Sequence, residues 1–563
     1  MRCQETARVV IAAVYLSTLC TVALYTSLSP EEGRAEPPTG IERSRALPSL
    51  QPPVLVKPLP PEELSKLNAI ARKAIQKSPI QSKTVVGIHH ALLDPSVVQQ
   101  VLKSRPANSA PKVIIELPNN QSAVIVTDSL EPAKGHVMWK GHVEGTPGSR
   151  VRFIVDAKTN TISGSIEKGR FIYEIRPAPS NTNVLEILAI DPSGFPPEHR
   201  SFRTPEASVS SPLRMLVNDR GSRPLKFLTN GGGTPSTPTP TTPTPTTPTA
   251  TTPVIDVMIL YTKAAADQDP NGIGPMACLA VEDLKEAFTN SGIQATARLV
   301  HHGIADNFTE ESSGNINDNL ESLRDAGNIS SNDIYKLRDT HGADVVSLWL
   351  SDANGSDCGM SPGLDVNQIP SANSAFSVVV RRCARSDRSF VHEVGHILQA
   401  NHDRYSEEAG NKPNDNDYNY GYVKADKGWM TVMSYHRPDC PLEDILDING
   451  QPVFENGVKK QRHVCNRRLN WSNPVVMDPV TGDPMGQPEG TSSNDCTDNE
   501  ATQEAKFQQP HPVITCDGPA ENAKVLKNTV ATVAGFRTGG SLGNVSCGTD
   551  TTPPAIPIGL IVH

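Results

Sequence analysis

Three histidines in the stretch VHEVGHILQANHD, residues 391–403, have a spacing that can hold a metal ion. On a helix, His392 and His396 lie one turn apart on the same face, about 6 Å along the axis, so both imidazoles reach one ion. Glu393 lies about 100° around the helix from His392, beside the metal, where a base can take a proton from metal-activated water. The spacing therefore predicts a zinc site that performs hydrolysis.

The third histidine, His402, sets a condition on the end of this helix. A continuous helix would carry His402 to the side opposite His396, so it joins the other two only if the chain turns back just after Leu398. The alternative is a helix that contains histidines by chance, since HExxH alone occurs in many unrelated helices. The third histidine favours the metal site.

The motif resembles the signature of the metzincin clan of zinc endopeptidases, HExxHxxGxxH followed by a Met-turn. All three histidines and the glutamate match the signature as His392, Glu393, His396 and His402. The clan has glycine where this chain has Gln399, because the turn there needs a left-handed residue. Either Gln399 bears a strain of roughly 1 to 2 kcal/mol or the turn shifts towards Asn401.

The downstream stretch GWMTVMSYHR supplies a Met-turn candidate at Met433, with Tyr435 two residues beyond. The aspartate directly after the third histidine, Asp403, resembles the residue found at that position in the reprolysin-like branch of the clan. The layout is most similar to bacterial reprolysin-like proteases, including the peptidyl-Asp metalloendopeptidase group, and the resemblance covers residues 254–540 well. It implies one catalytic zinc ion and Glu393 as general base. It also implies that Met433 lies beneath the metal site without contacting the ion. It also implies that Tyr435 hydrogen-bonds the tetrahedral intermediate or ligates the resting metal.

The elements around the motif alternate between apolar runs of buried-strand type and segments with helical spacing. VIDVMILYT, ADVVSLWLS and FSVVVRRC are the expected strands, and CLAVEDLKEAFTNSG and IYKLRDTHG are the expected helices. Strands that alternate with helices predict an α/β (α+β) metzincin-like catalytic domain that carries the active-site helix. Before it, short alternating runs such as KVIIELP, SRVRFIVD and RFIYEIRP predict a mainly β region.

The chain divides into five segments. A charged start followed by a long apolar run predicts an export signal over residues 1–29, with an uncleaved membrane anchor as the alternative. Residues 30–230 are the expected propeptide, mainly β, and the Thr-Pro repeats of 231–253 predict an extended linker. The catalytic domain follows over 254–540. Residues 541–563 resemble the opening strand of a fibronectin type III module or form a disordered tail.

Ten cysteines agree with export, because eight follow the Thr/Pro tract and none lies between Ser29 and that tract. An even set in one region of an exported chain predicts disulfides, and no CxxC pair indicates a second zinc site. Cys358 and Cys383 flank predicted strand material just before the motif helix, so we expect them to pair. Because the propeptide lacks cysteine, latency must come from a blocking carboxylate or from simple occlusion.

The net charge of -9, with Asp+Glu 61 against Lys+Arg 52 and no long basic run, gives no indication of nucleic-acid binding. The polar stretch NDNDYNYG, residues 414–421, could bind calcium, but its spacing is not that of an EF-hand. The sequence gives no oligomeric state. It predicts a secreted zinc endopeptidase, made as a zymogen, that acts on protein or peptide substrates without stable membrane association unless the N-terminal segment is an anchor. The alternative is an inactive zinc-containing surface adhesin, which would have no need of Glu393.

Overall fold

The computed structural model describes residues 51–537, together with residues 545 and 547. Within this span the gaps are 105–109, 199–251, 312–314, 326–328, 352–356, 365–367, 408–416, 494–517 and the single positions 134, 157, 180 and 270. The predicted signal or anchor, nearly all of the Thr/Pro linker, most of the tail and part of the polar stretch 414–421 therefore lie outside the described residues. None of the helices in the described part of the chain has the length and apolar character needed to cross a bilayer.

The described residues from Pro52 onwards form one compact unit, in which we distinguish a β-rich region (52–198) and an α/β region (252 onwards). The β-rich region holds one nine-stranded antiparallel sheet in the order β1-β2-β9-β8-β7-β6-β5-β4-β3. Its strands are β1 (Val56–Pro58), β2 (Val85–Leu93), β3 (Lys112–Leu117), β4 (Gln121–Ala133), β5 (His136–Val143), β6 (Arg150–Asp156), β7 (Ile162–Lys168), β8 (Phe171–Ala178) and β9 (Asn181–Ile190). Its helices are α1 (Pro61–Lys77), α2 (Gln81–Thr84), α3 (Pro95–Lys103) and the short η1 (Pro192–Gly194).

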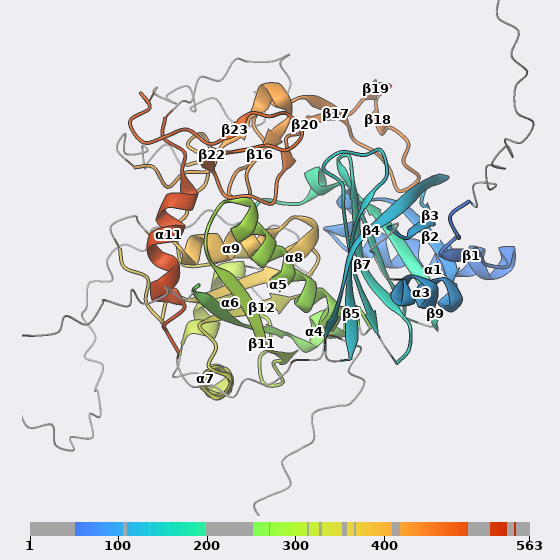
Figure 1. Cartoon of the computed structure of the whole chain (residues 1–563), viewed down its shortest axis with the longest axis horizontal. Helices are drawn as coiled ribbons and strands as arrows, with labels where there is room; N and C mark the ends of the chain where they lie inside the picture. Colours follow the sequence, from blue (N-terminus) through green and yellow to red (C-terminus); the bar gives the residue numbers. More distant parts are fainter. Residues whose placement is uncertain are drawn as a thin grey trace, which may run out of the picture. The chain divides into compact units, whose positions relative to one another are not determined.

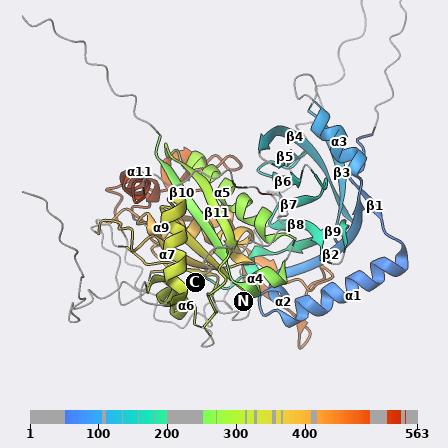
Figure 2. The same ribbon diagram turned by 90° about the horizontal axis from the view of Figure 1, so that it is seen from below.

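This sheet curls strongly, as Figure 2 shows. The edge strand β3 meets the segment just before β1. The Leu55 N–H donates to the Ile114 carbonyl of β3, and the Ile114 N–H donates to the Pro53 carbonyl. The alternating apolar residues found in the sequence point into the curl, since successive side chains on a strand face opposite sides. Trp139 and Phe153 lie fully buried there, with ring centroids 5.4 Å apart.

The α/β region is built on a five-stranded sheet in the order β11-β10-β12-β14-β13 (Figure 1). The first four strands are parallel and the edge strand β13 is antiparallel to β14. The strands are β10 (Val254–Tyr261), β11 (Thr296–Ile304), β12 (Val345–Leu350), β13 (Gly359–Met360) and β14 (Phe376–Val380). The helices are α4 (Lys263–Gln268), α5 (Ile273–Asn290), α6 (Ile316–Arg324), α7 (Ile329–His341), α8 (Cys383–Ser386), α9 (Ser389–Ile397) and α11 (Asn522–Val533).

Helices cover both faces of this sheet, which explains why its strands are continuous apolar runs. One set of strand residues, including Ile255 and Val257, packs with apolar residues of α5, α9 and α11. The alternate set, including Met258 and Leu260, packs with apolar residues of α6 and α7. The predicted mixed α/β class is confirmed, and the structure positions α9 between β14 and the C-terminal part of the chain.

Short strand pairs and three disulfides among the described residues complete the α/β region. The short elements are β15 (Val423–Lys424), η2 (Ala425–Lys427), β16 (Trp429–Met430), β17 (Leu442–Asp444), β18 (Phe454–Glu455), β19 (Val458–Lys459), β20 (Gln461–His463), β21 (Asn466–Arg467), β22 (Asn473–Met477) and β23 (Pro484–Met485). Of these described strand pairs, only β16 with β21 is parallel. The predicted bond between Cys358 and Cys383 is confirmed. It ties the start of β13 to α8, directly before α9. The other two bonds join Cys278 to Cys547 and Cys440 to Cys465.

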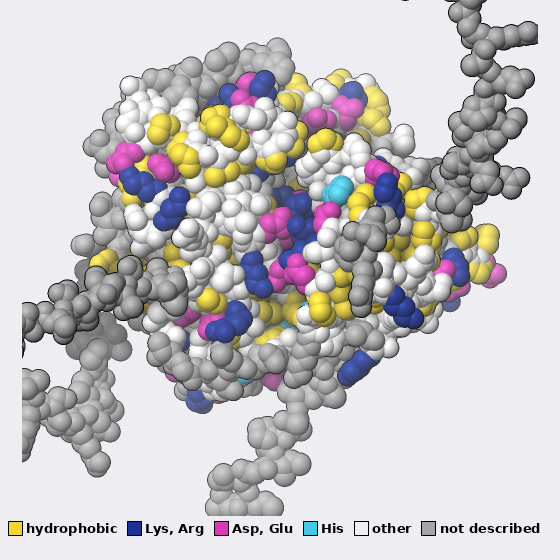
Figure 3. All heavy atoms as spheres, viewed as in Figure 1, with side chains coloured by type: hydrophobic (Ala, Val, Ile, Leu, Met, Phe, Trp, Pro, Cys, Tyr) yellow, Lys and Arg dark blue, Asp and Glu magenta, His cyan; other side chains and the backbone are white. Residues whose placement is uncertain are grey.

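The β-rich and α/β regions meet across buried ion pairs. Arg150 of β6 contacts Asp283 and Glu286 of α5 at 2.8 and 3.0 Å. Arg385 of α8 contacts the same Asp283 at 2.8 Å. Acidic and basic side chains accordingly gather between β7 and α8 in the surface view (Figure 3).

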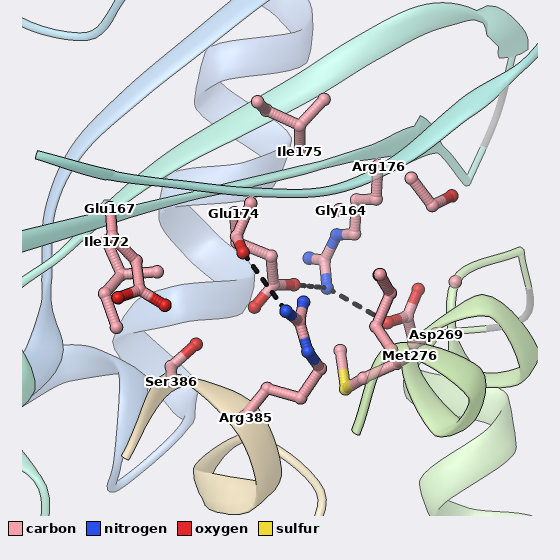
Figure 4. A pocket seen from close by; sticks show the side chains of 14 residues that line it. Gly164, Glu167, Ile172, Glu174, Ile175, Arg176, Asp269, Met276, Arg385 and Ser386 are labelled. Atoms are coloured by element: carbon pink, nitrogen blue, oxygen red, sulfur yellow. Dashed lines mark hydrogen bonds and ion pairs between the residues drawn. The ribbon is translucent and has the colours of Figure 1, made fainter. Parts of the chain in front are cut away.

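A second charged group lies deeper in this interface (Figure 4). Arg176 of β8 extends towards Asp269 of the α/β region, at 3.4 Å, and also contacts Glu174 and Glu186 of its own sheet. Arg381 contacts the same oxygen of Asp269, Oδ2, at 3.0 Å. Ion pairs therefore lie at the centre of the interface between the β-rich and α/β regions.

Candidate active site

Helix α9 carries the motif and ends where the histidine spacing requires. It runs over Ser389–Ile397 with Leu398 as its C-cap. The Ala400 N–H donates to the Gly395 carbonyl and the Gln399 N–H donates to the His396 carbonyl, both at 2.9 Å. This pair of bonds is the Schellman motif, which closes a helix with a left-handed residue.

That left-handed residue is Gln399, with φ of 71°. Of the two alternatives drawn from the sequence, the first is correct: Gln399 takes the strained conformation and the turn does not shift to Asn401. Two contacts hold it there. Its side-chain amide donates to the Gln368 carbonyl, and its own carbonyl accepts from Asn419 at 2.7 Å.

The helix end brings the three histidines together. The Nε2 atoms of His392, His396 and His402 lie 3.1, 2.9 and 3.2 Å from one another. Two nitrogens that each lie ~2.1 Å from one zinc ion are at most ~4.2 Å apart, so these separations fit a shared ion. Among the described residues, no other three His, Cys, Asp or Glu side chains are so placed.

The second ring nitrogen of each histidine is also engaged. Nδ1 of His392 is 3.0 Å from the Val432 carbonyl, and Nδ1 of His396 is 2.8 Å from the Ala400 carbonyl. Nδ1 of His402 lies 3.6 Å from a Glu407 carboxylate oxygen. A carbonyl accepts only from a protonated Nδ1, which leaves Nε2 with its lone pair towards the centre.

Burial favours the neutral form of His392 and His396, which is the form that binds metal. It lowers the pKa of His392, against the opposing effect of Glu198. Burial, followed by the neighbouring His392, lowers the pKa of His396 to about 3. Neutral donors that converge in a buried site are the ligand set expected for zinc.

Glu393 is buried beside the histidines and is held by one hydroxyl. The Ser361 hydroxyl, just after β13, donates to Glu393 Oε2 at 2.6 Å. A Cβ on Gly359 would lie 2.6 Å from Oε1, so glycine lets β13 approach the carboxylate. Oε1 has no hydrogen-bond partner among the described residues. Burial raises the pKa of Glu393 well above its ordinary value, which makes it a strong proton acceptor when it is ionised.

A tight turn at residues 431–434 lies under α9. Its Ser434 N–H donates to the Thr431 carbonyl at 3.0 Å, and the intervening Met433 is fully buried. A Cβ on Gly395 would lie only 2.6 Å from Met433 Sδ and 2.7 Å from Trp471 Nε1. Helix and turn can therefore pack this closely because residue 395 is glycine.

Tyr435 follows this turn and reaches the histidines. Its hydroxyl lies 3.1 Å from His402 Nε2, and its backbone N–H donates to the Asp403 carboxylate at 3.1 Å. Asp403 directly follows His402, so this hydrogen bond ties the end of the turn to the third histidine. The structure places the predicted Tyr435 at the three histidines.

Three further residues reach this site without having been predicted from the sequence. Ser361 contacts Glu393, as described above. Glu198 of the β-rich region and Arg467 of β21 form an ion pair at 2.8 Å, and the Glu198 carbonyl accepts from the Tyr435 hydroxyl at 3.2 Å. No local pattern marks these residues, because each acts through partners distant in the sequence.

Comparison with known proteins agrees with this arrangement. The family model Reprolysin_5, described as Metallo-peptidase family M12, matches residues 251–442. A peptidyl-Asp metalloendopeptidase of Stenotrophomonas maltophilia is 25% identical over 479 residues, which cover 82% of this chain and 92% of that protein. A second, of Xanthomonas campestris pv. campestris, is 25% identical over 423 residues, covering 73% and 78%.

Among solved structures, metalloproteinase-II from Bacteroides fragilis aligns with 58% of this chain and 87% of that chain, at 10% identity and a TM-score of 0.29. A likeness at this TM-score carries no conclusion. The family match and the two relatives confirm the resemblance to reprolysin-like metalloendopeptidases that was predicted from the motif.

Proposed function

We propose that this chain, whose residues 251–442 are a reprolysin-like metallo-peptidase domain of family M12, is a secreted zinc endopeptidase made as a zymogen. The proposal rests on the convergence of the three Nε2 atoms beside Glu393 Oε1, which has no hydrogen-bond partner in the described part of the chain. His392, His396 and His402 would hold one zinc ion, and the buried turn at Met433 would serve as the Met-turn.

When bound, zinc would activate a water molecule and polarise the scissile carbonyl. Glu393 would accept the proton of the attacking water at Oε1 and pass it to the departing amine. Ser361 would hold the other carboxylate oxygen and keep Oε1 turned to the reaction. The Tyr435 hydroxyl would donate a hydrogen bond to the oxyanion that forms at the carbonyl.

The relatives give the substrate class for this proposal. Both are named peptidyl-Asp metalloendopeptidases. We extend that name to this chain as a preference for peptide bonds next to aspartate. The β-rich region would act as the propeptide, since its residue Glu198 lies in the site in the uncleaved chain.

Paired substitutions of Glu393 and His396 test the proposal. In Glu393→Gln the metal ligands remain, so zinc should stay bound at one ion per chain while peptide hydrolysis falls by ~10²- to 10⁴-fold. His396→Ala removes a ligand and should lose both zinc and activity. Zinc content and casein cleavage are measured on each protein after removal of the β-rich region by limited proteolysis.

Glu321→Gln, on the exposed side of α6, is the matched control and should behave as wild type. A wild-type protein that binds zinc and cleaves nothing would favour the inactive zinc-containing adhesin. Full hydrolysis by Glu393→Gln would show that another group is the base.

A further inference from the structure

Residues 195–198 of the β-rich region run through the candidate active site. The Cys358 N–H, next to the edge strand β13, donates to the Pro197 carbonyl at 3.1 Å. The Tyr435 hydroxyl donates to the next carbonyl, that of Glu198, at 3.2 Å. Consecutive peptide groups are thus held from two walls of the site. The segment lies where a bound peptide would form main-chain hydrogen bonds beside a sheet edge.

The Glu198 side chain ends in a buried site for a carboxylate. Oε1 accepts from Arg467 Nη1 and from the Ser389 hydroxyl, both at 2.8 Å, and Oε2 accepts from Arg467 Nη2 at 3.3 Å. Two guanidinium donors facing two carboxylate oxygens match the planar shape of the group. Glu198 is 1% exposed. Burial alone would raise the pKa of Glu198, but Arg467, together with smaller contributions from other groups around the carboxylate, lowers it to about 2.

Arg467 does not depend on Glu198 to keep its position. Its guanidinium also donates to the carbonyls of Asp387 and Ser434, at 2.7 and 3.1 Å. The Asp387 carboxyl is 3.2 Å away, but burial, with Glu198 adding to it, raises the pKa of Asp387 well above its ordinary value. Glu198 is therefore the ionised partner of Arg467. The α/β region anchors the arginine, and the β-rich region supplies the anion.

We propose that Arg467 and Ser389 form the subsite that receives an acidic substrate side chain next to the scissile bond, and that Glu198 occupies this subsite in the uncleaved chain. The inference rests on the proposed peptidase function and assigns residues to its aspartate preference. Arg467 and Ser389 are thus specificity-determining residues. Glu198 is the blocking carboxylate, acting through the subsite at Arg467.

The subsite is fixed relative to the histidines. Ser389 is the first residue of α9, which carries His392 and His396. The guanidinium carbon of Arg467 lies 5.7 Å from the centre of the Tyr435 ring, and the Tyr435 hydroxyl lies 3.1 Å from His402 Nε2. A residue whose carbonyl meets Tyr435 therefore has its carboxylate within reach of Arg467, as Glu198 does.

The test uses the full chain, loaded with zinc, and two quenched peptides that differ only in Asp or Asn next to the cleaved bond. Glu198→Gln should raise cleavage of the Asp peptide at least ~10-fold over the uncut wild type, because an amide loses the ionic contact. The control variant is Glu116→Gln, because Glu116 is an exposed carboxylate of the same region. This substitution should leave the rate unchanged.

In the Glu198→Gln background, Arg467→Lys should lower the ratio of kcat/KM for Asp over Asn by about 10- to 100-fold. Ser389→Ala, which removes one hydrogen bond, should lower it by about 3- to 10-fold. Circular dichroism shows whether each variant folds. If Arg467→Lys does not fold, the ratio in Ser389→Ala decides.

Three results would overturn the assignment. Equal cleavage of both peptides by Glu198→Gln would show that no acid subsite exists, and an unchanged ratio in Arg467→Lys or Ser389→Ala would place it elsewhere. A Glu198→Gln chain no more active than wild type would remove Glu198 from the blocking role. If zinc-loaded protein cleaves neither peptide even after limited proteolysis, the proposed peptidase function itself fails.

Discussion

At the scale of single residues, Gln399 adopts a strained backbone conformation that brings the three histidines together. A non-glycine residue in left-handed geometry costs roughly 1 to 2 kcal/mol. Its turn brings His402 back to His396, so the strain is located where the proposed metal site needs it. The side-chain bond to the Gln368 carbonyl partly offsets the cost, and glycine could not make that bond.

These opposing terms give a prediction for Gln399→Gly. Relief of strain favours glycine, whereas loss of a hydrogen bond worth ~0.5–1.5 kcal/mol and the greater chain entropy of glycine, ~0.5–1 kcal/mol, oppose it. The free energy of unfolding should therefore change by less than about 1 kcal/mol, with zinc affinity and hydrolysis kept. Urea unfolding of the zinc-loaded chain measures it.

Gln399→Val is the contrasting variant. A β-branched side chain is a poor fit to positive φ, so this variant should unfold at clearly lower urea than either wild type or Gln399→Gly. Equal stability of the valine and glycine variants would show that residue 399 leaves the left-handed region when it is changed.

At the scale of elements, α9 and the turn at residues 431–434 function as one unit. The turn supplies the Val432 carbonyl that fixes the ring of His392, while Gly395 lets Met433 and Trp471 approach the helix. The disulfide between Cys358 and Cys383 ties β13, which precedes Ser361, to the helix immediately before α9. His392 and Glu393 are thus positioned by two different segments that pack against α9.

The close packing predicts the effect of Gly395→Ala. The added methyl group would meet Met433 and Trp471, and overpacking of this kind typically costs ~1–3 kcal/mol. Because α9 would have to move away from the turn, His392 and His396 would shift relative to His402. We expect a lower melting temperature in calorimetry and a weaker zinc affinity in competition with a chelator.

Gly274→Ala provides the control, since Gly274 is also helical but lies on α5. Its added Cβ would meet only His302 ring atoms, the nearest at 3.2 Å, which a small side-chain shift relieves. Zinc affinity should stay at the wild-type value in this variant. If both alanine variants bound zinc as wild type does, close packing on the turn would not be what positions the ligands.

At the scale of the whole molecule, the β-rich and α/β regions are joined by charge. Arg150, Asp283 and Arg385 form one buried group, and Arg176, Asp269 and Arg381 form another. Buried ion pairs contribute little net stability, because both partners lose hydration. A charged interface also leaves each region with a soluble face after separation. Such an interface is compatible with the proposed role of the β-rich region as a propeptide, which would first stay bound and later leave.

The position of β10 predicts where the chain is cut on maturation. Val254 begins a strand that pairs with β11 on one side and β12 on the other, and the Thr296 N–H donates to the Pro253 carbonyl. Loss of residues beyond Val254 would remove ladder bonds from an interior strand of the sheet. N-terminal sequencing of the active species should therefore find a start between residues 199 and 254.

Two observations would contradict this prediction. A start inside β10 would mean that the sheet tolerates disruption of an interior strand. A fully active enzyme with residues 60–220 still covalently attached would mean that the β-rich region is not a propeptide.

The sequence by itself determined the features that depend on local repetition. Apolar runs gave β10, β12 and β14, because a strand covered on both faces needs apolar side chains throughout. The spacing of His392, His396 and His402 predicted the end of α9, since the third histidine lies six residues after the second and joins the other two only if the helix stops. Cys358 and Cys383 were likewise paired correctly, since both flank the strands before α9.

Only the tertiary structure decided which distant groups complete the site. Glu198 and Arg467 are 269 residues apart and neither lies in a motif, yet they meet beside Tyr435. Ser361 reaches Glu393 from an edge strand, and Val432 reaches His392 from a turn. Such contacts depend on how whole elements pack, which no periodic pattern of side chains records. The three histidines could therefore be identified along the chain as proposed ligands, whereas the groups that support them and the carboxylate opposite Arg467 could be identified only in the folded structure.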